Sequence, residues 1–264
     1  MSVIKKHIEN INLSGRKALS VYLTSGFPNK NNFVSLALKV FEAGADMIEI
    51  GIPFSDPLAD GPIIQSSSKS ALENGINLKQ TLNYTTEIKN KISKPVILMG
   101  YANPVLKYGL KNFVTDSINS GVSGIILPDV PVEEYDAFFT CDMGKLDIIL
   151  LTTPTSSIDR IKAIDSKSKG FIYCVSVMGT TGMRKHFERD VLDNLKRTYS
   201  NVEKNKMMIG FGISDSESIK IFSPYSDGLI VGSAVIKKLF DDDSVFSHTT
   251  KLVKELSDAC VVTS

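Results

Sequence analysis

The chain has 264 residues and a formal net charge of +1, and 42% of its residues are hydrophobic and 22% charged. At this length one apolar core can be buried without disulfides or metal ions, and the composition is that of an ordinary globular protein. The balanced charge, with no concentrated basic run, argues against a nucleic-acid-binding protein.

The first element in chain order is a short amphipathic helix within residues 1–17. Its apolar residues have helical spacing instead of the continuous apolar core of a signal peptide. No later apolar run is long enough to cross a bilayer. The three cysteines are odd in number and widely spaced, which favours a reducing compartment. We therefore expect a cytoplasmic protein that does not act at a membrane.

Eight short, almost continuously apolar runs follow, as expected for parallel strands that are buried on both faces. They cover residues 19–24, 47–51, 96–100, 124–127, 148–152, 171–176, 207–210 and 228–231. Amphipathic helical stretches separate them, among them 32–43, 78–91, 111–120 and 214–222, and a last helix is expected over 244–261.

This alternation predicts the fold class: an α/β protein with one (β/α)8 TIM barrel, an N-terminal helix and extra short helices in the βα loops. An open, doubly wound sheet is the competing interpretation, but eight strand–helix units fit a closed barrel better. No linker or change of composition divides the chain, so residues 1–264 are expected to form a single domain.

The connection after the second predicted strand is long and stiff. Residues 53–62 contain three prolines together with Asp56 and Asp60. Proline restricts a loop, and such a loop opens on the face of a barrel where active sites lie. Asp60 precedes a helix predicted near 62–72, so it could either cap that helix or contact a substrate.

Glu49 is the first candidate catalytic residue. Strand alternation places Ile48 and Ile50 on the face that the helices cover, which turns Glu49 toward the barrel interior. A carboxylate there is costly to bury unless it is paired, hydrogen-bonded or protonated. A structural ion pair is the alternative, but the eight predicted strands contain no Lys, Arg or His. Catalysis is therefore the favoured interpretation.

Glycine-bearing turns follow the last three predicted strands, at 179–182, 210–214 and 232–234. Glycines let backbone amides approach an anion, and the third turn opens into a helix whose N-terminus adds donors. Loops after strands seven and eight form the recurrent phosphate site of TIM barrels, although βα turns also need glycine for geometry alone.

Three aromatic residues are candidate walls of the same cavity. Tyr173 alternates with Phe171 and Val175 and could bring its hydroxyl into the barrel, or it could be an ordinary core tyrosine. Tyr22 and Phe211 are similar candidates. The predicted strands carry no lysine for a Schiff base and no cluster of metal ligands. Carboxylate acid–base chemistry on a phosphate-anchored substrate is what remains.

The segment 46–62 closely resembles the signature of the tryptophan synthase alpha subunits, which are indole-3-glycerol-phosphate lyases. The segments 99–104, 127–131, 210–214 and 232–234 support this resemblance. It implies a reversible retro-aldol cleavage of indole-3-glycerol phosphate to indole and glyceraldehyde 3-phosphate. Glu49 matches the family's general acid–base, and Asp60 matches the carboxylate that binds the indole N–H.

The resemblance also assigns the pocket. Tyr173 matches a tyrosine beside the indole, and Thr181 supplies a hydroxyl near the catalytic carboxylates. The positions that match the phosphate site are Gly182, Gly212, Gly232 and Ser233. The chain departs from many members at Val177 and Thr180, where the family often has arginine and valine.

Partners and cofactors follow from the resemblance alone. It implies a beta subunit that carries pyridoxal phosphate and consumes the indole, in an alpha2beta2 heterotetramer, and no cofactor or metal in this chain. Residues 53–62 and 103–109 are the candidate contact surfaces. The alternatives are another phosphate-binding barrel enzyme, a free-standing lyase, or a catalytically silent regulatory subunit.

Overall fold

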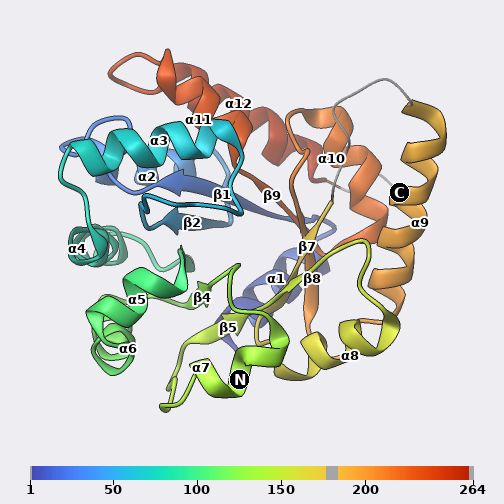
Figure 1. The fold of residues 1–264 in the computed structure, drawn as a ribbon. Coiled ribbons are helices and arrows are strands. Elements are labelled where there is room, and N and C mark those ends of the chain that lie inside the picture. The colour runs from blue at the N-terminus through green and yellow to red at the C-terminus, as the bar shows by residue number, and fades with distance from the viewer. Residues whose placement is uncertain (1, 177–183, 262–264) are drawn as a thin grey trace.

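The computed structural model describes residues 2–176 and 184–261, with the backbone alone described for 184–190. Parallel strands run through the centre of the molecule and helices surround them (Figure 1). The strands are β1 Ala18–Thr24, β2 Met47–Gly51, β3 Val96–Met99, β4 Gly124–Ile126, β5 Asp147–Ile149, β6 Leu151–Thr152, β7 Phe171–Val175, β8 Lys206–Gly210 and β9 Gly228–Val231.

The strand order is β5-β4-β3-β2-β1-β9-β8-β7-β6, so the two edges of this sheet are β5 and β6. These two strands are consecutive in the chain and are separated only by Leu150. The amide of Leu150 donates to the Ser168 hydroxyl at 2.9 Å, while its carbonyl accepts from the amide of Tyr173 at 3.0 Å. β5 and β6 are thus the fifth predicted strand, interrupted once, and the ring is closed. The predicted (β/α)8 barrel is confirmed.

Helices cover the outside of the ring. The longer ones are α1 Val3–Leu13, α2 Phe33–Glu42, α3 Pro62–Glu73, α4 Leu78–Lys89, α6 Leu110–Asn119, α8 Ile158–Lys167, α9 Arg184–Ser200 and α12 Ser247–Ala259. Short helices lie in the βα segments, as predicted: α5 Ala102–Tyr108, α7 Tyr135–Phe138, α10 Ser216–Phe222 and α11 Ser233–Phe240, with 3-10 turns at Val132–Glu134 and Ser223–Tyr225.

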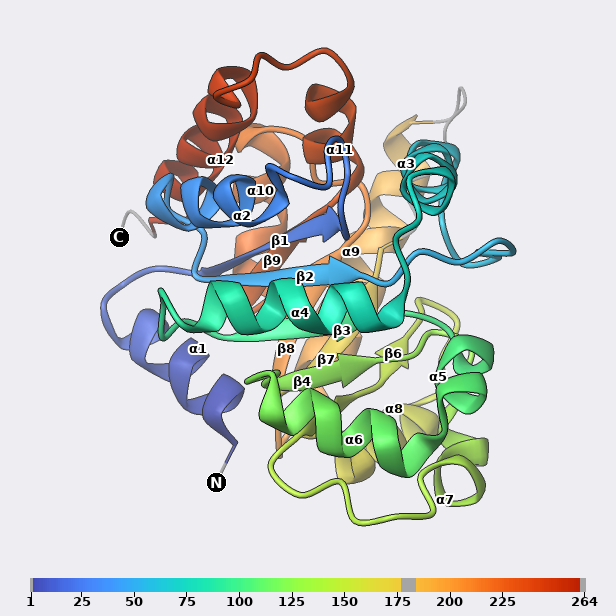
Figure 2. The ribbon, with the colours of Figure 1, turned by 90° about the vertical axis from the view of Figure 1, so that its left-hand side faces the viewer.

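The two ends of the barrel differ. Figure 2 shows the predicted N-terminal helix, α1, at the end where the strands begin, while the loop that follows β2 extends from the opposite end. The last helix begins at Ser247, three residues later than predicted. The carboxylates of Asp242 and Asp243 accept hydrogen bonds from amides of its first turn. Nowhere in the described ranges is a helix both long and apolar enough to cross a membrane.

Candidate active site

Glu49 lies in the interior of the barrel, as predicted. It pairs in register with Tyr22 of β1, and its side chain is fully buried. Its Oε1 accepts a hydrogen bond from the Ser20 hydroxyl at 2.9 Å, whereas Oε2 has no partner among the described residues. Among the described residues, no Lys, Arg or His forms an ion pair with Glu49, so the alternative of a structural salt bridge gains no support.

Burial decides the charge state of this carboxyl. Desolvation raises the pKa of Glu49 to about 7, although the hydrogen bond from Ser20 lowers it. A carboxyl that titrates near neutrality can both give and take a proton under physiological conditions. The pKa of Tyr173 is raised, first by burial and then by the negative charge of Glu49, which is consistent with both side chains facing the same interior.

Asp60 does not cap α3. The N-cap position of α3 is Gly61, and no side chain makes a capping hydrogen bond there, so the capping alternative is wrong. Instead, Asp60 Oδ2 accepts a hydrogen bond from the Tyr101 hydroxyl at 2.9 Å, and that hydroxyl accepts from the Ala59 amide at 3.1 Å. Burial raises the pKa of Asp60 to about 6, against the lowering effect of the Tyr101 hydrogen bond.

A cavity of about 250 Å³ opens at this end of the barrel. Its walls are mostly apolar, and Asp60 is the one carboxylate among its described lining residues. The lining includes Tyr22, Asp60, Gly61, Pro62, Ile63, Ile64, Met99, Tyr173, Phe211, Gly212, Ile213, Ile230, Gly232 and Ser233. A flat aromatic ligand with one polar N–H would match such walls. Glu49 is not among these residues, but its register partner Tyr22 is.

Two glycines make room for the two tyrosines. A Cβ on Gly51 would lie 1.9 Å from the Tyr22 hydroxyl, and a Cβ on Gly210 would lie 2.2 Å from the Tyr173 hydroxyl. Both tyrosines are almost fully buried, at 7% and 5% exposure, yet both line the cavity. They are therefore core and wall residues at once, and the two interpretations of Tyr173 are not exclusive.

Two of the glycine-bearing turns, those after β8 and β9, contribute Gly212, Gly232 and Ser233 to the wall of the cavity. Phe211 and Gly212 both have positive φ, 73° and 75°, and positive φ is uncommon for a non-glycine residue. Gly232 is the N-cap of α11, and no described group accepts a hydrogen bond from the amides of Ser233, Ala234 or Val235. These free N–H groups and the helix dipole suit an anion.

Seven of the predicted site residues line one cavity: Tyr22, Asp60, Tyr173, Phe211, Gly212, Gly232 and Ser233. Glu49 is fully buried and pairs in register with Tyr22. Thr181 and Gly182, like Val177 and Thr180, lie outside the described residues. The sequence reasoning missed Ser20 and gave Tyr101 no role of its own. The Ser20–Glu49 and Tyr101–Asp60 hydrogen bonds each join residues from different strand–loop units. The only sequence signal for Tyr101 was its place in the motif Met99–Pro104.

Comparison with known proteins agrees with this geometry. Residues 8–261 match the family model described as "Tryptophan synthase alpha chain". The chain belongs to this family. The lyase of tryptophan biosynthesis predicted from the motifs is thereby confirmed.

Relatives named tryptophan synthase alpha chain resemble the chain over most of its length. The protein from Petrotoga mobilis is 43% identical, with 91% of this chain and 92% of the relative covered. That from Prochlorococcus marinus subsp. pastoris is 40% identical over 98% of this chain and 92% of the relative.

Solved structures show the same fold. Tryptophan synthase subunit alpha from Legionella pneumophila superposes with a TM-score of 0.89 at 31% identity, and 98% of each chain is covered. A chain of tryptophan synthase from M. tuberculosis gives a TM-score of 0.88 at 28% identity, with 99% of each chain covered.

Proposed function

We propose that the protein cleaves indole-3-glycerol phosphate to indole and glyceraldehyde 3-phosphate, with Glu49 as the general acid–base. The observation that carries this proposal is a fully buried carboxyl with one oxygen that has no described partner. Its register partner Tyr22 lines an apolar cavity that also reaches the N-terminus of α11. The cavity would hold the indole ring, and the amides would hold the phosphate.

One carboxyl can make both proton transfers. Protonated Glu49 donates its proton to C3 of the indole, which places a positive charge on the ring nitrogen. The Glu49 carboxylate then takes the proton of the glycerol hydroxyl on the adjacent carbon. The O–H electrons form the aldehyde C=O as the C–C bond breaks, and its electrons restore the aromatic ring. Glu49 ends protonated, as it began.

Asp60 supplies the second part of the chemistry. As a carboxylate at the cavity wall, it would accept a hydrogen bond from the indole N–H. It would also stabilise the positive charge that develops on the ring nitrogen after C3 is protonated. The Tyr101 hydroxyl, at 2.9 Å, fixes one of its oxygens and leaves the other for the ring. The two carboxyls thus take opposite protonation states, Glu49 neutral and Asp60 charged. The pKa of Glu49, about 7, is higher than that of Asp60, about 6, which favours this assignment.

The phosphate would bind at the N-terminus of α11, where Gly232 and Ser233 face the cavity, and against Gly212. Gly182 is proposed to complete this end of the site, and Thr181 is proposed to supply a hydroxyl near the catalytic carboxylates. No step in this mechanism needs a cofactor or metal bound to the chain.

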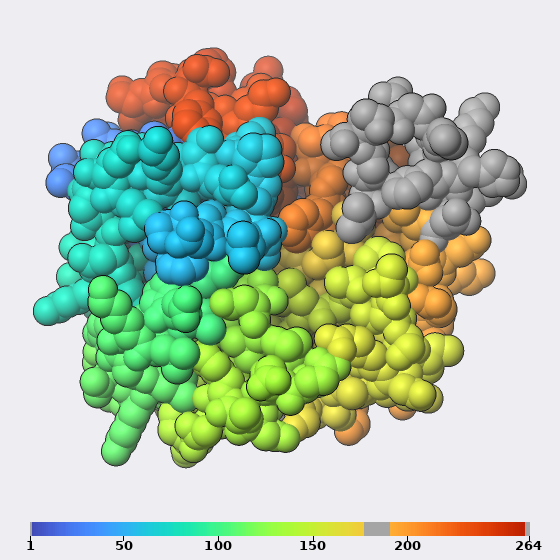
Figure 3. Space-filling view, in the orientation of Figure 1, coloured from blue at the N-terminus to red at the C-terminus, as the bar shows by residue number. Residues whose placement is uncertain are grey.

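A surface beside the site is proposed to bind a beta subunit that carries pyridoxal phosphate, in an alpha2beta2 assembly. The loop after β2 and the segment near 101–103 and 128–129 border a common hollow of about 540 Å³, and both lie on the face shown in Figure 3. Leu58, which lines this hollow, is 93% exposed, and Leu106, three residues after Asn103 in the predicted contact segment 103–109, is 55% exposed. Exposed apolar side chains at a cleft are typical of a docking surface.

The direct test is indole release. The purified protein is mixed with indole-3-glycerol phosphate, with and without a tryptophan synthase beta subunit, and indole and glyceraldehyde 3-phosphate are measured. Equal amounts of both products support the proposed reaction, and a higher rate with the beta subunit supports the proposed partner. No release of either product under both conditions would refute the proposed activity.

A further inference from the structure

Ser20 makes the one hydrogen bond that the Glu49 carboxyl receives from the described part of the protein. Both side chains are fully buried, and the Ser20 Oγ–Glu49 Oε1 distance is 2.9 Å. Ser20 lies two residues before Tyr22, the register partner of Glu49, so its hydroxyl reaches the carboxyl from the side where the strands begin. Tyr22 lines the cavity, whereas Ser20 and Glu49 are not among the residues that line it.

We propose that Ser20 is a positioning residue for Glu49: its hydroxyl holds Oε1 and leaves Oε2 as the oxygen that exchanges protons with the substrate. This inference rests on the proposed function, because it refines the role of the catalytic carboxyl. It assigns separate tasks to the two oxygens, which the family's general acid–base role does not.

The hydrogen-bond pattern supports this division. Oε1 accepts the Ser20 hydrogen, whereas Oε2 is buried without any described partner. A buried polar atom without a partner is rare and needs a reason, and a reacting group is one such reason. When Glu49 is protonated, the carbonyl-type oxygen is the better acceptor, so the Ser20 contact directs the acidic proton to Oε2.

Ser20 also limits rotation of the carboxyl. A carboxyl group turns about its last torsion through a broad, roughly two-fold profile, so without a partner its two oxygens would exchange positions. A hydroxyl at 2.9 Å that stays on one oxygen removes this freedom. Pre-orientation of a reacting group is a recognised source of rate enhancement.

The test compares Ser20→Ala and Ser20→Thr with the wild type. Alanine removes the hydroxyl without adding bulk, and threonine restores a hydroxyl on a residue that a strand tolerates. Ser25→Ala is the matched control. Ser25 is equally buried directly after the same strand, but its hydroxyl contacts Thr81 instead of Glu49.

Two quantities are measured for each variant. The first is the titration midpoint of the Glu49 carboxyl, followed by 13C NMR and assigned by the signal that Glu49→Gln lacks. The second is the split between kcat and KM for indole release. In Ser20→Ala the midpoint should rise by about one pH unit, since a hydrogen bond to a charged group is lost. The kcat should fall about tenfold or more with little change of KM.

The outcomes separate this inference from the proposed function. An unchanged midpoint in Ser20→Ala, or a kcat like that of Ser25→Ala, overturns the role of Ser20 even if Glu49→Gln is inactive. Full turnover in Glu49→Gln refutes the proposed function, whatever Ser20→Ala does to the titration. In Ser20→Thr, the wild-type midpoint and most of kcat should return, and failure of both in a folded protein counts against the inference.

Discussion

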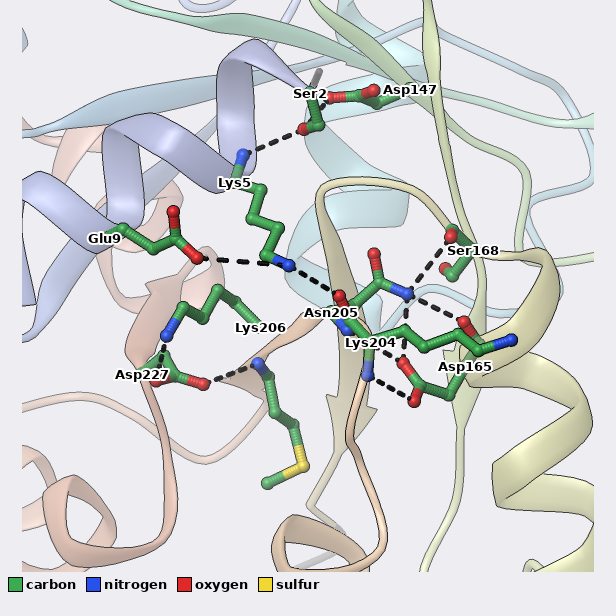
Figure 4. Close-up of polar contacts among 11 residues, drawn as sticks. Ser2, Lys5, Glu9, Asp147, Asp165, Ser168, Lys204, Asn205, Lys206 and Asp227 are labelled. Carbon is green, nitrogen blue, oxygen red and sulfur yellow. Dashed lines mark hydrogen bonds and ion pairs between the residues drawn. The ribbon is translucent and has the colours of Figure 1, made fainter.

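Both ends of the barrel contain acidic side chains, but these side chains have different surroundings at the two ends. At the end where the strands begin, Asp165 accepts from the amides of Glu203, Lys204 and Asn205, and Asp227 pairs with Lys206 at 3.5 Å (Figure 4). At the other end, the carboxylates of Glu49 and Asp60 each accept one hydrogen bond and form no ion pair among the described residues.

The pKa of Asp165 and those of Glu49 and Asp60 are shifted in opposite directions. Burial alone would raise the pKa of Asp165, but the backbone hydrogen bonds from Lys204 and Glu203 outweigh it and hold the pKa below its ordinary value. For Glu49 and Asp60, burial prevails and the pKa values rise to about 7 and about 6. The donors around Asp165 therefore favour its charged form, whereas the carboxyl of Glu49, with one described donor, can hold a proton near neutral pH.

The largest expected effect is the loss of turnover at the catalytic end. Glu49→Gln keeps the shape of the side chain and removes the titrating proton, so kcat should fall by about 10²- to 10⁴-fold. Binding of glycerol phosphate should stay within about threefold, because the amides at the α11 N-terminus are untouched. Steady-state assays and calorimetry check both, and wild-type turnover would remove Glu49 from the mechanism.

The matched change at the other end should affect stability instead. Asp165→Asn replaces an acceptor for three amides with a weaker one, and we expect a loss of about 2–3 kcal/mol in the free energy of unfolding. The stabilisation belongs to the charged form, so the difference from wild type should shrink as pH falls below 4. Urea unfolding measures it. A change of more than about threefold in kcat/KM would contradict a purely structural role for Asp165.

Glu49→Gln should also gain stability at high pH. The folded-state pKa of Glu49 is raised from 4.5 to about 7, so folding favours the protonated form. Its contribution to stability is lost as pH rises from 4.5 through 7, and the wild type then carries a buried charge. We expect Glu49→Gln to be more stable than wild type by about 2–3 kcal/mol at pH 8, and near equal to it at pH 4. A variant that is less stable at pH 8 would show that the charge is compensated.

The smallest predicted effect is on the phosphate wall. A Cβ on Gly232 would lie 3.4 Å from Tyr22 and 3.6 Å from Ile64, both ordinary contacts, so Gly232→Ala should fold normally. The added methyl group would stand beside the free amides, and KM should rise about tenfold, equivalent to about 1.4 kcal/mol, with kcat nearly unchanged. An unchanged KM would contradict binding of the phosphate at the α11 N-terminus.

Much of this arrangement could be predicted from the sequence because it depends on local periodicity. The alternation of β2 correctly predicted that Glu49 points inward, and the glycine turns after β8 and β9 pointed to residues that line the cavity. The contacts of Ser20 with Glu49 and of Tyr101 with Asp60 could not be predicted, since each joins residues at least 29 apart whose approach depends on barrel register. The break at Leu150 likewise results from closure of the ring, not from a local signal.

The most direct measurement is the pH dependence of kcat/KM for indole release between pH 5 and 8.5. The mechanism needs Asp60 charged and Glu49 protonated in the free enzyme, so the profile should be a bell with limbs near pH 6 and pH 7. Asp60→Asn should lose the acid limb and keep the alkaline one, while any titration of the substrate phosphate stays common to both proteins. An activity that keeps rising up to pH 8.5 would contradict a proton-holding Glu49 and with it the proposed mechanism.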